Sequence, residues 1–163
     1  MGVGLMVAAV RPLVASDIEA AAALEAAERS HPWSEGVFAD ELAAVNRVYL
    51  AAGVGNHLVG FGGLMVVGDE AHITNLLVAP DHRRAGIGRQ LMVALVDAAI
   101  SRGARHLTLE VRSRNHAARA LYDLFGLAPV GMRKGYYDDD DALILWVHDI
   151  DGDQFQTRLE SLR

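Results

Sequence analysis

The feature that most constrains the fold is an apolar run followed by a basic, glycine-bearing loop and then by a segment with helical periodicity. Residues 73–78 are aliphatic and β-branched, which predicts a buried strand. Pro80 ends this strand, because a proline cannot continue a central ladder. Residues 90–100 then carry apolar side chains at the spacing of a helix face. A strand, a glycine loop and a helix in this order present backbone N–H groups to a phosphate.

The side chains of the loop agree with that use. Gly86 and Gly88 can adopt a positive φ and let a ligand approach the backbone closely. Arg83, Arg84 and Arg89 place three positive charges around the loop, in a chain whose formal net charge is -6. A local cationic site in an acidic protein indicates a specific small anion and argues against a nucleic-acid partner.

The loop lacks one common nucleotide-binding pattern and matches another only in part. The pattern G-x-x-x-x-G-K-[ST] is absent, which argues against a nucleoside triphosphatase. Gly86 and Gly88 supply two glycines of a dinucleotide-binding fingerprint, but Leu91 stands where the third belongs. Glu110 falls about 20 residues further on, where that fingerprint has a ribose-binding acid. A dinucleotide-binding protein therefore stays open as an alternative.

Length and composition exclude several classes of protein. At 163 residues we expect one domain over residues 1–163, and the 52% hydrophobic content is typical of a folded globule. The absence of Cys excludes a disulfide framework, a cysteine-based metal site and a cysteine acyl-enzyme. No apolar run reaches the roughly 18 residues of a membrane span, and the first ten residues lack the basic region of a signal peptide. We therefore expect a cytoplasmic protein with no membrane partner.

The whole chain alternates between strand-like and helix-like patterns. We expect strands at residues 6–10, 47–53, 58–67, 73–78, 106–111, 127–137 and 142–149. We expect helices at about residues 16–29, 34–45, 90–100 and 115–125, with a marginal helix in the C-terminal tail 150–163. The order β-α-α-β-β-β-α-β-α-β-β predicts the α/β (α+β) class, with a mixed central β-sheet flanked by helices.

Two local patterns make further predictions. Glycines in the strand at 58–67 indicate a bulge or the close approach of another backbone; they are Gly60, Gly62 and Gly63. The helix at 115–125 has a line of apolar residues that we expect to face the core; they are Ala117, Leu121 and Leu124.

The residues 83–88, Arg-Arg-Ala-Gly-Ile-Gly, resemble the R/Q-x-x-G-x-G/A pyrophosphate-binding motif of the GNAT acyl-CoA N-acetyltransferases. The preceding Asn-Leu-Leu-Val at 75–78 and the following helix also match, and the order of elements is that of the GNAT fold. The narrower match is to the bacterial RimI type of this family. It rests on four blocks, which are His31–Ser34, Leu109–Asn115, Ala120–Tyr122 and Gly135–Tyr137.

The resemblance implies acetyl-CoA as the acyl donor, held by the loop and by the strand before it. The loop would bind the pyrophosphate, and the strand backbone would pair with the pantetheine arm. An N–H near Val78 would serve as oxyanion donor, and Asn115 would contact the coenzyme while it caps a helix. The implied coenzyme-binding residues are Leu76, Leu77, Val78, Arg83, Arg84, Ala85, Gly86, Ile87, Gly88, Arg89 and Asn115.

Acyl transfer from a thioester to an amine requires a base for the amine, a donor for the oxyanion and a proton for the leaving thiolate. Glu110 lies in the block that matches the family's catalytic glutamate, which implies a general base acting through water. The alternative is a solvated carboxylate on the polar side of a strand. Tyr122 matches the family's proton-donating tyrosine, and its phenol, with a reference pKa near 10, keeps its proton at neutral pH. The alternative is an ordinary core aromatic residue.

The acceptor is constrained by amine chemistry. An α-amine has a pKa near 8, so roughly a tenth is neutral at pH 7, whereas under about a thousandth of Lys is neutral. A base acting through water therefore favours an N-terminal amine. The resemblance implies direct attack in a ternary complex by the N-terminal peptide, with Ala first, of a protein such as a small-subunit ribosomal protein. Trp33, Tyr136 and Tyr137 would line the peptide groove, unless they are packing residues.

Two other readings of function stay open, a lysine or small-amine acetyltransferase and a non-catalytic acyl-CoA-binding module. The acidic run Asp138–Asp141 is most simply a solvated hairpin turn, although it would also attract a basic peptide. Four successive residues on a turn seldom converge on a metal, and the seven His lack the H-E-x-x-H spacing. We therefore predict no metal site.

Overall fold

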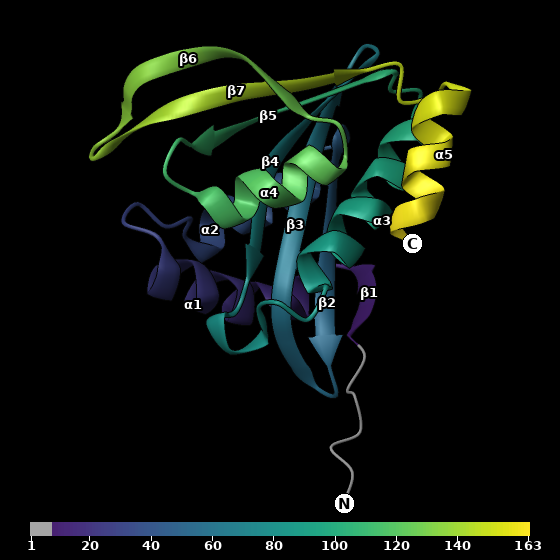
Figure 1. Cartoon of the computed structure of the whole chain (residues 1–163). Coiled ribbons are helices and arrows are strands. Elements are labelled where there is room, and N and C mark those ends of the chain that lie inside the picture. The colour runs from purple at the N-terminus through teal and green to yellow at the C-terminus, as the bar shows by residue number, and fades with distance from the viewer. Residues whose placement is uncertain (1–7) are drawn as a thin grey trace, which may run out of the picture. The chain divides into compact units, whose positions relative to one another are not determined.

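The computed structural model describes residues 8–163, and within them the helices and strands follow the predicted order (Figure 1). The strands are β1 (Ala9–Pro12), β2 (Arg47–Val54), β3 (His57–Val67), β4 (Glu70–Val78), β5 (His106–Arg112), β6 (Ala128–Tyr137) and β7 (Asp140–His148). The helices are α1 (Ile18–Glu28), α2 (Glu35–Ala43), α3 (Ile87–Ser101), α4 (His116–Leu124) and α5 (Asp153–Leu162). The tail helix is confirmed as α5, whereas residues 6 and 7 of the expected first strand lie outside the described residues.

Within residues 8–163 the strands form a mixed sheet in the order β1-β2-β3-β4-β5-β7-β6. β4 pairs with β5 in parallel, whereas β7 pairs antiparallel with both β5 and β6, and β1 pairs antiparallel with β2. The predicted fold class is therefore confirmed. The chain divides into two compact units. Unit 1 holds residues 8–64 and 75–95, and unit 2 holds residues 65–74 and 96–163.

The core of unit 1 is built on aromatic rings from α2 and from strands β2 and β3. Phe38 of α2 is buried and meets Phe61 of β3 edge to face, with ring centroids 5.3 Å apart. Tyr49 of β2 is also buried, and its hydroxyl donates to Glu41 at 2.8 Å. Ala21 of α1 belongs to the same buried cluster, so this Ala-rich helix packs with a small side chain against the rings.

The glycines of β3 lie where other groups leave no room for a side chain. A Cβ on Gly60 would come within 3.0 Å of the Leu77 carbonyl oxygen, and a Cβ on Gly63 would overlap the Tyr49 ring. The predicted close approach of a backbone is confirmed at Gly60. At Gly63 the neighbour is an aromatic ring instead, which sequence alone did not indicate.

We expect Gly63→Ala to lower the free energy of unfolding by about 1–3 kcal/mol, because the added methyl group must displace the buried Tyr49 ring. Urea denaturation of the two proteins measures this difference. Gly53→Ala is the matched control, since its Cβ would meet only the His57 carbonyl at an ordinary 3.5 Å. Equal effects of the two substitutions would contradict the packing argument.

In unit 2, β5 alternates between a buried face and a polar face. Leu107, Leu109 and Val111 are buried. Thr108 and Glu110 face the other side, and the Thr108 hydroxyl donates to the Leu145 carbonyl of β7 at 2.8 Å. The antiparallel β6–β7 hairpin extends the sheet beyond β5 (Figure 1). The predicted alternation of β5 therefore places Glu110 opposite the core face.

The predicted apolar face of α4 is wrong. Ala117 and Leu124 are exposed and Leu121 is only partly buried, whereas Tyr122 and Phe125 are buried. Two neighbouring lines of apolar residues run along this nine-residue helix, and their spacing is the same, so periodicity did not decide between them. The line with the two aromatic rings is the one that packs, because those rings remove more apolar area from water.

An ion pair fixes the chain just before α1. The Arg11 guanidinium donates to both Asp17 oxygens, at 2.7 Å and 2.8 Å, and the Val14 backbone N–H donates to Asp17 Oδ2 at 2.8 Å. The hydrogen bonds from Arg11, helped by the Val14 amide, hold the pKa of Asp17 below its ordinary value against the opposing effect of burial. Asp17 therefore stabilises the folded chain in its ionised form.

A folded-state pKa below the unfolded one contributes stability above the unfolded pKa, near 4, and loses it as pH falls through the folded pKa. We therefore expect Asp17→Asn to lower the free energy of unfolding by about 1–2 kcal/mol at pH 7, and expect the difference from wild type to shrink below pH ~4. Urea denaturation at pH 7 and pH 3 checks this. Asp40→Asn, at an exposed carboxylate of α2, is the control; a pH-independent loss in Asp17→Asn would count against the ion pair.

Candidate functional site

The loop between β4 and α3 has two left-handed residues. Arg84 has φ 63° and Gly86 has φ 81°. The first hydrogen bond of α3 runs from the Gln90 N–H to the Gly86 carbonyl at 3.0 Å. The amides of residues 87–89 precede that bond, and amides at this position have no partner within the helix. Left-handed turns followed by such amides form a concave surface for an anion.

The three arginines of the loop differ in their contacts. Arg83 donates from Nη2 to Glu28 of α1 at 2.7 Å and from Nε to the Val78 carbonyl at 3.0 Å. Arg84 and Arg89 are exposed, and within the described residues they pair with no carboxylate. Ile87 is buried, so its side chain anchors the start of α3 in the core. Arg83 therefore braces the loop, while the other two guanidinium groups are available to an anion.

The end of β4 presents two carbonyl groups to arginine side chains. The Leu76 carbonyl accepts from Arg29 Nη2 at 3.1 Å, and the Val78 carbonyl accepts from Arg83 Nε at 3.0 Å. Leu77 lies between them, and its carbonyl is the one that faces Gly60 of β3. Because successive carbonyls alternate along a strand, Leu76 and Val78 present theirs on the edge away from β3. The backbone of these residues is predicted to pair with the pantetheine arm.

Glu110 lies in the middle of unit 2, opposite Ile144 of β7. Its side chain is 18% exposed, so it is neither a fully solvated group nor a sealed one. Arg133 of β6 lies 3.4 Å from it, Nε to Oε1. A half-buried carboxylate that water can still reach is compatible with the predicted base that acts through a water molecule.

Tyr122 is buried in α4, and its backbone carbonyl accepts the amides of Phe125 at 3.0 Å and Leu127 at 3.2 Å. Asn115 caps this helix: its Oδ1 accepts the Ala118 N–H at 3.2 Å. The capping role predicted for Asn115 is therefore confirmed, and its side-chain NH₂ is left to face solvent or a ligand.

The three aromatic residues predicted to line a peptide groove have different surroundings. Trp33 is half-buried in unit 1 and packs edge-on against Phe38 at 5.3 Å. Tyr136 is 54% exposed and meets Tyr137 edge to face at 5.1 Å, near the tip of the β6–β7 hairpin in unit 2. The Arg112 guanidinium lies 4.2 Å from the centroid of the Tyr137 ring. Trp33 therefore packs against the core of unit 1, whereas Tyr136 and Tyr137 lie together at the surface of unit 2.

The acidic run is less solvated than its sequence predicted. Residues 138 and 139 form the turn, and β7 already begins at Asp140. The Asp140 side chain is only 6% exposed; it accepts from the Ser113 hydroxyl and from the backbone amides of Arg114 at 2.9 Å and Asp141 at 2.7 Å. The Ser113 hydroxyl, with those amides, holds the pKa of Asp140 below its ordinary value. Asp140 therefore fixes the loop between β5 and α4.

Sequence reasoning missed this role, because Asp140 and Ser113 lie 27 positions apart and no local pattern relates them. The loop that Asp140 fixes carries the chain from Glu110 to Asn115 and Tyr122. Both candidate catalytic residues of unit 2 thus depend on one buried carboxylate for the course of the backbone between them.

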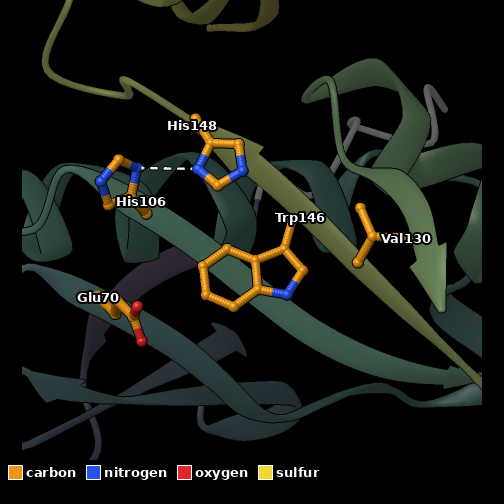
Figure 2. A pocket seen from close by; sticks show the side chains of 5 residues that line it. All are labelled: Glu70, His106, Val130, Trp146 and His148. Carbon is orange, nitrogen blue, oxygen red and sulfur yellow. Dashed lines mark hydrogen bonds between the residues drawn. The ribbon is translucent and has the colours of Figure 1, made fainter.

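A hollow lies near the start of β5 in unit 2 (Figure 2). It has a volume of about 360 Å³ and is lined by Glu70, His106, Val130, Trp146 and His148. His106 and His148 share a hydrogen bond between their Nδ1 atoms at 3.1 Å. None of the residues predicted from sequence lines this hollow, and its His106 lies four residues, or about 13 Å, along β5 from Glu110.

Within residues 8–163, no three His, Asp or Glu side chains come together in a way that would hold a metal ion. In the same part of the chain no helix combines the length and apolar character that a membrane crossing requires.

Comparison with known proteins places these features in a family. The model of the acetyltransferase (GNAT) family matches residues 18–127. A protein of Bacillus subtilis (strain 168), provisionally named a [ribosomal protein bS18]-alanine N-acetyltransferase, is 40% identical over 143 residues, which are 86% of this chain and 95% of the relative. The crystal structure of the ribosomal-protein-S18-alanine N-acetyltransferase from Escherichia coli superposes with a TM-score of 0.80 at 34% identity, over 87% of this chain and 94% of that one.

Arabidopsis thaliana NAA60 in complex with acetyl-CoA shares the fold, with a TM-score of 0.78 at 19% identity over 86% of this chain and 98% of that one. The chain belongs to the acetyltransferase (GNAT) family. It is an acetyl-CoA-dependent N-acetyltransferase, similar to the bacterial RimI enzymes, as the loop and the order of elements predicted.

We expect Asn115→Ala to lower the free energy of unfolding by about 1 kcal/mol, because the Ala118 N–H loses its acceptor. Asn115→Asp is the matched control: a carboxylate caps equally well, so its stability should stay within a few tenths of a kcal/mol of wild type. Thermal or urea unfolding measures both variants. Equal destabilisation of the two would show that the cap oxygen is not what Asn115 contributes.

Proposed function

We propose that this enzyme acetylates the N-terminal α-amine of a protein, with Ala as the first residue and a small-subunit ribosomal protein as the acceptor. The observation that carries the proposal is the left-handed turn at Arg84 and Gly86 before α3, in a chain that aligns over most of its length with a ribosomal-protein-S18-alanine N-acetyltransferase. An acceptor of this kind places the enzyme in the cytoplasm.

The acyl donor is acetyl-CoA, and the loop residues 83–89 suit its diphosphate. Amides at the start of α3 and the positive end of the helix dipole favour an anion there. Arg84 and Arg89 add charge from exposed positions, whereas Arg83 acts by bracing the loop against Glu28. The β4 edge at residues 76–78 receives the pantetheine arm, and Asn115 offers its NH₂ group to the coenzyme.

The transfer is a direct attack of the amine on the thioester carbonyl carbon. Glu110 removes a proton from the amine through a water molecule. A backbone N–H near Val78 donates to the oxyanion as the new C–N bond forms. Tyr122 gives its phenolic proton to the sulfur as the C–S bond breaks, so the coenzyme leaves as a neutral thiol. Glu110 then releases the proton it took to solvent and the Tyr122 phenolate takes one up from solvent, which restores both groups for the next turnover.

Several charges favour a basic N-terminal peptide. Asp138 and Asp139 stand at the tip of the β6–β7 hairpin, next to the exposed Tyr136. The chain as a whole carries a formal charge of -6. At the hairpin tip Asp139 already pairs with Arg112, so the attraction for an N-terminal segment rich in Lys and Arg comes from the net charge of the chain. Tyr136 and Tyr137 lie beside these carboxylates. Their rings can contact the backbone of a peptide and the apolar stems of its Lys and Arg side chains, so this surface suits a peptide better than a small polyamine.

An acceptor screen tests the proposal. With acetyl-CoA held constant, an Ala-starting peptide with basic residues should be acetylated, and the same peptide with a blocked N-terminus and one internal Lys should not. Preferential use of the blocked Lys peptide would replace the proposal with a lysine acetyltransferase. Tight acetyl-CoA binding without turnover of any amine would replace it with a binding module.

We expect Glu110→Gln to lower kcat on the order of 10²–10⁴-fold, because the amide accepts no proton from the attacking amine. The acetyl-CoA Kd should stay close to wild type, since no coenzyme contact is assigned to Glu110. Steady-state kinetics with the Ala peptide and calorimetry with acetyl-CoA measure the two quantities. Glu70→Gln, an exposed carboxylate at the start of β4, is the control. An unchanged kcat in Glu110→Gln would remove Glu110 from catalysis.

A further inference from the structure

Glu25 is a buried carboxylate in the last turn of the Ala-rich helix α1. Its side chain is 2% exposed, and leaving such a charge unpaired would cost about 3–5 kcal/mol. Three N–H groups surround it. Arg29 Nε at 3.3 Å and Asn75 Nδ2 at 2.9 Å donate to Oε1, and the Trp33 backbone N–H donates to Oε2 at 2.9 Å. The carboxylate is therefore held by the end of α1, by the loop between α1 and α2, and by β4.

Arg29 extends this network to the backbone of β4. Its Nη2 donates to Asn75 Oδ1 at 3.0 Å and to the Leu76 carbonyl at 3.1 Å. Asn75 thus donates to Glu25 and accepts from Arg29, which fixes the orientation of its amide. The Leu76 oxygen keeps a second lone pair, so it can still accept a donor from a ligand.

Stability alone does not call for a carboxylate at this position. Replacing a buried ionic network by packed apolar groups is often neutral or stabilising. The carboxylate instead sets geometry. Its two oxygens accept three hydrogen bonds, and these bonds fix the relative positions of three segments of unit 1. The fixed segments include the loop that carries Trp33 and the strand position Leu76.

We propose that Glu25 is a positioning residue for acetyl transfer, because it locks the loop at Trp33 to β4 at Leu76. The inference rests on the proposed function, in which Trp33 borders the acceptor peptide and Leu76 belongs to the coenzyme strand. A misplacement of about 1 Å between reacting groups costs on the order of 10²-fold in rate. If the hydrogen bonds between this loop and this strand are weakened, turnover therefore falls, although the groups that transfer protons are unchanged.

The test is Glu25→Gln. This substitution keeps the shape of the side chain, but it replaces one acceptor oxygen by an NH₂ group, which cannot accept a hydrogen bond from the donor it faces. Two results are expected: faster hydrogen exchange at the Trp33 amide and across residues 75–78, and a kcat/KM for the Ala peptide lower on the order of 10²-fold. The acetyl-CoA Kd should change by less than about threefold, because a separate pair, Arg83 with Glu28, holds the coenzyme loop.

Two further variants keep the test decisive. Glu19→Gln, an exposed position on the same helix, should leave exchange and kinetics unchanged. Arg29→Lys keeps the charge but loses the planar fork that joins Glu25 to Leu76. Because Arg29 is 37% exposed, this variant should fold, and it should shift both readouts in the same direction as Glu25→Gln. It decides the question if Glu25→Gln does not fold.

Unchanged exchange at the Trp33 amide would overturn the proposal, and so would faster exchange with an unchanged kcat/KM. Failure of the wild-type enzyme to acetylate any peptide would remove the proposed function instead. The two failures are distinguishable, because amide exchange needs no acceptor: faster exchange at both segments in Glu25→Gln supports the coupling, and its absence refutes it.

Discussion

The turn that joins β4 to α3 is the constraint on which the proposed coenzyme site depends. A residue with a side chain at φ 63°, as at Arg84, costs about 1–3 kcal/mol and persists only where its surroundings over-determine it. Contacts of the neighbouring residues offset this cost at Arg84. Ile87 is buried in the core, and Arg83 ties the loop to the Val78 carbonyl and to Glu28. The strain is local, and its result is a row of amides that face outward at the start of a helix.

The Ala-rich helix α1 contacts the strand of the proposed coenzyme site through its charged residues. Glu25 and Glu28 each hold an arginine, Arg29 and Arg83, and each arginine donates in turn to a carbonyl of β4. The two carbonyls lie two residues apart, so they point to the same edge of the strand. A strand edge without a partner strand leaves such carbonyls to be satisfied in another way. Two guanidinium groups do this, and α1 determines where those groups stand.

Local patterns were enough to predict the order of elements, the glycine turn before α3 and the cap at Asn115, because each is set by residues close together in the chain. Two features that sequence did not reveal share a physical cause. Glu25 meets Asn75 across 50 positions and Asp140 meets Ser113 across 27, so no window of the sequence contains either pair. The face of α4 failed for a different reason, since two lines of apolar residues have equal spacing and only packing distinguishes them.

Three carboxylates in the described part of the chain hold loops in place through backbone amides. Asp17, Glu25 and Asp140 each accept at least one backbone amide together with a side-chain donor, so their lone pairs are committed to holding loops in place. Glu110 differs: within residues 8–163 its partner is one guanidinium at 3.4 Å, and no backbone amide donates to it. An ionised carboxylate has about four acceptor positions, so Glu110 has room for a water molecule. Glu110 therefore keeps the free acceptor positions that its proposed role as a base acting through water requires.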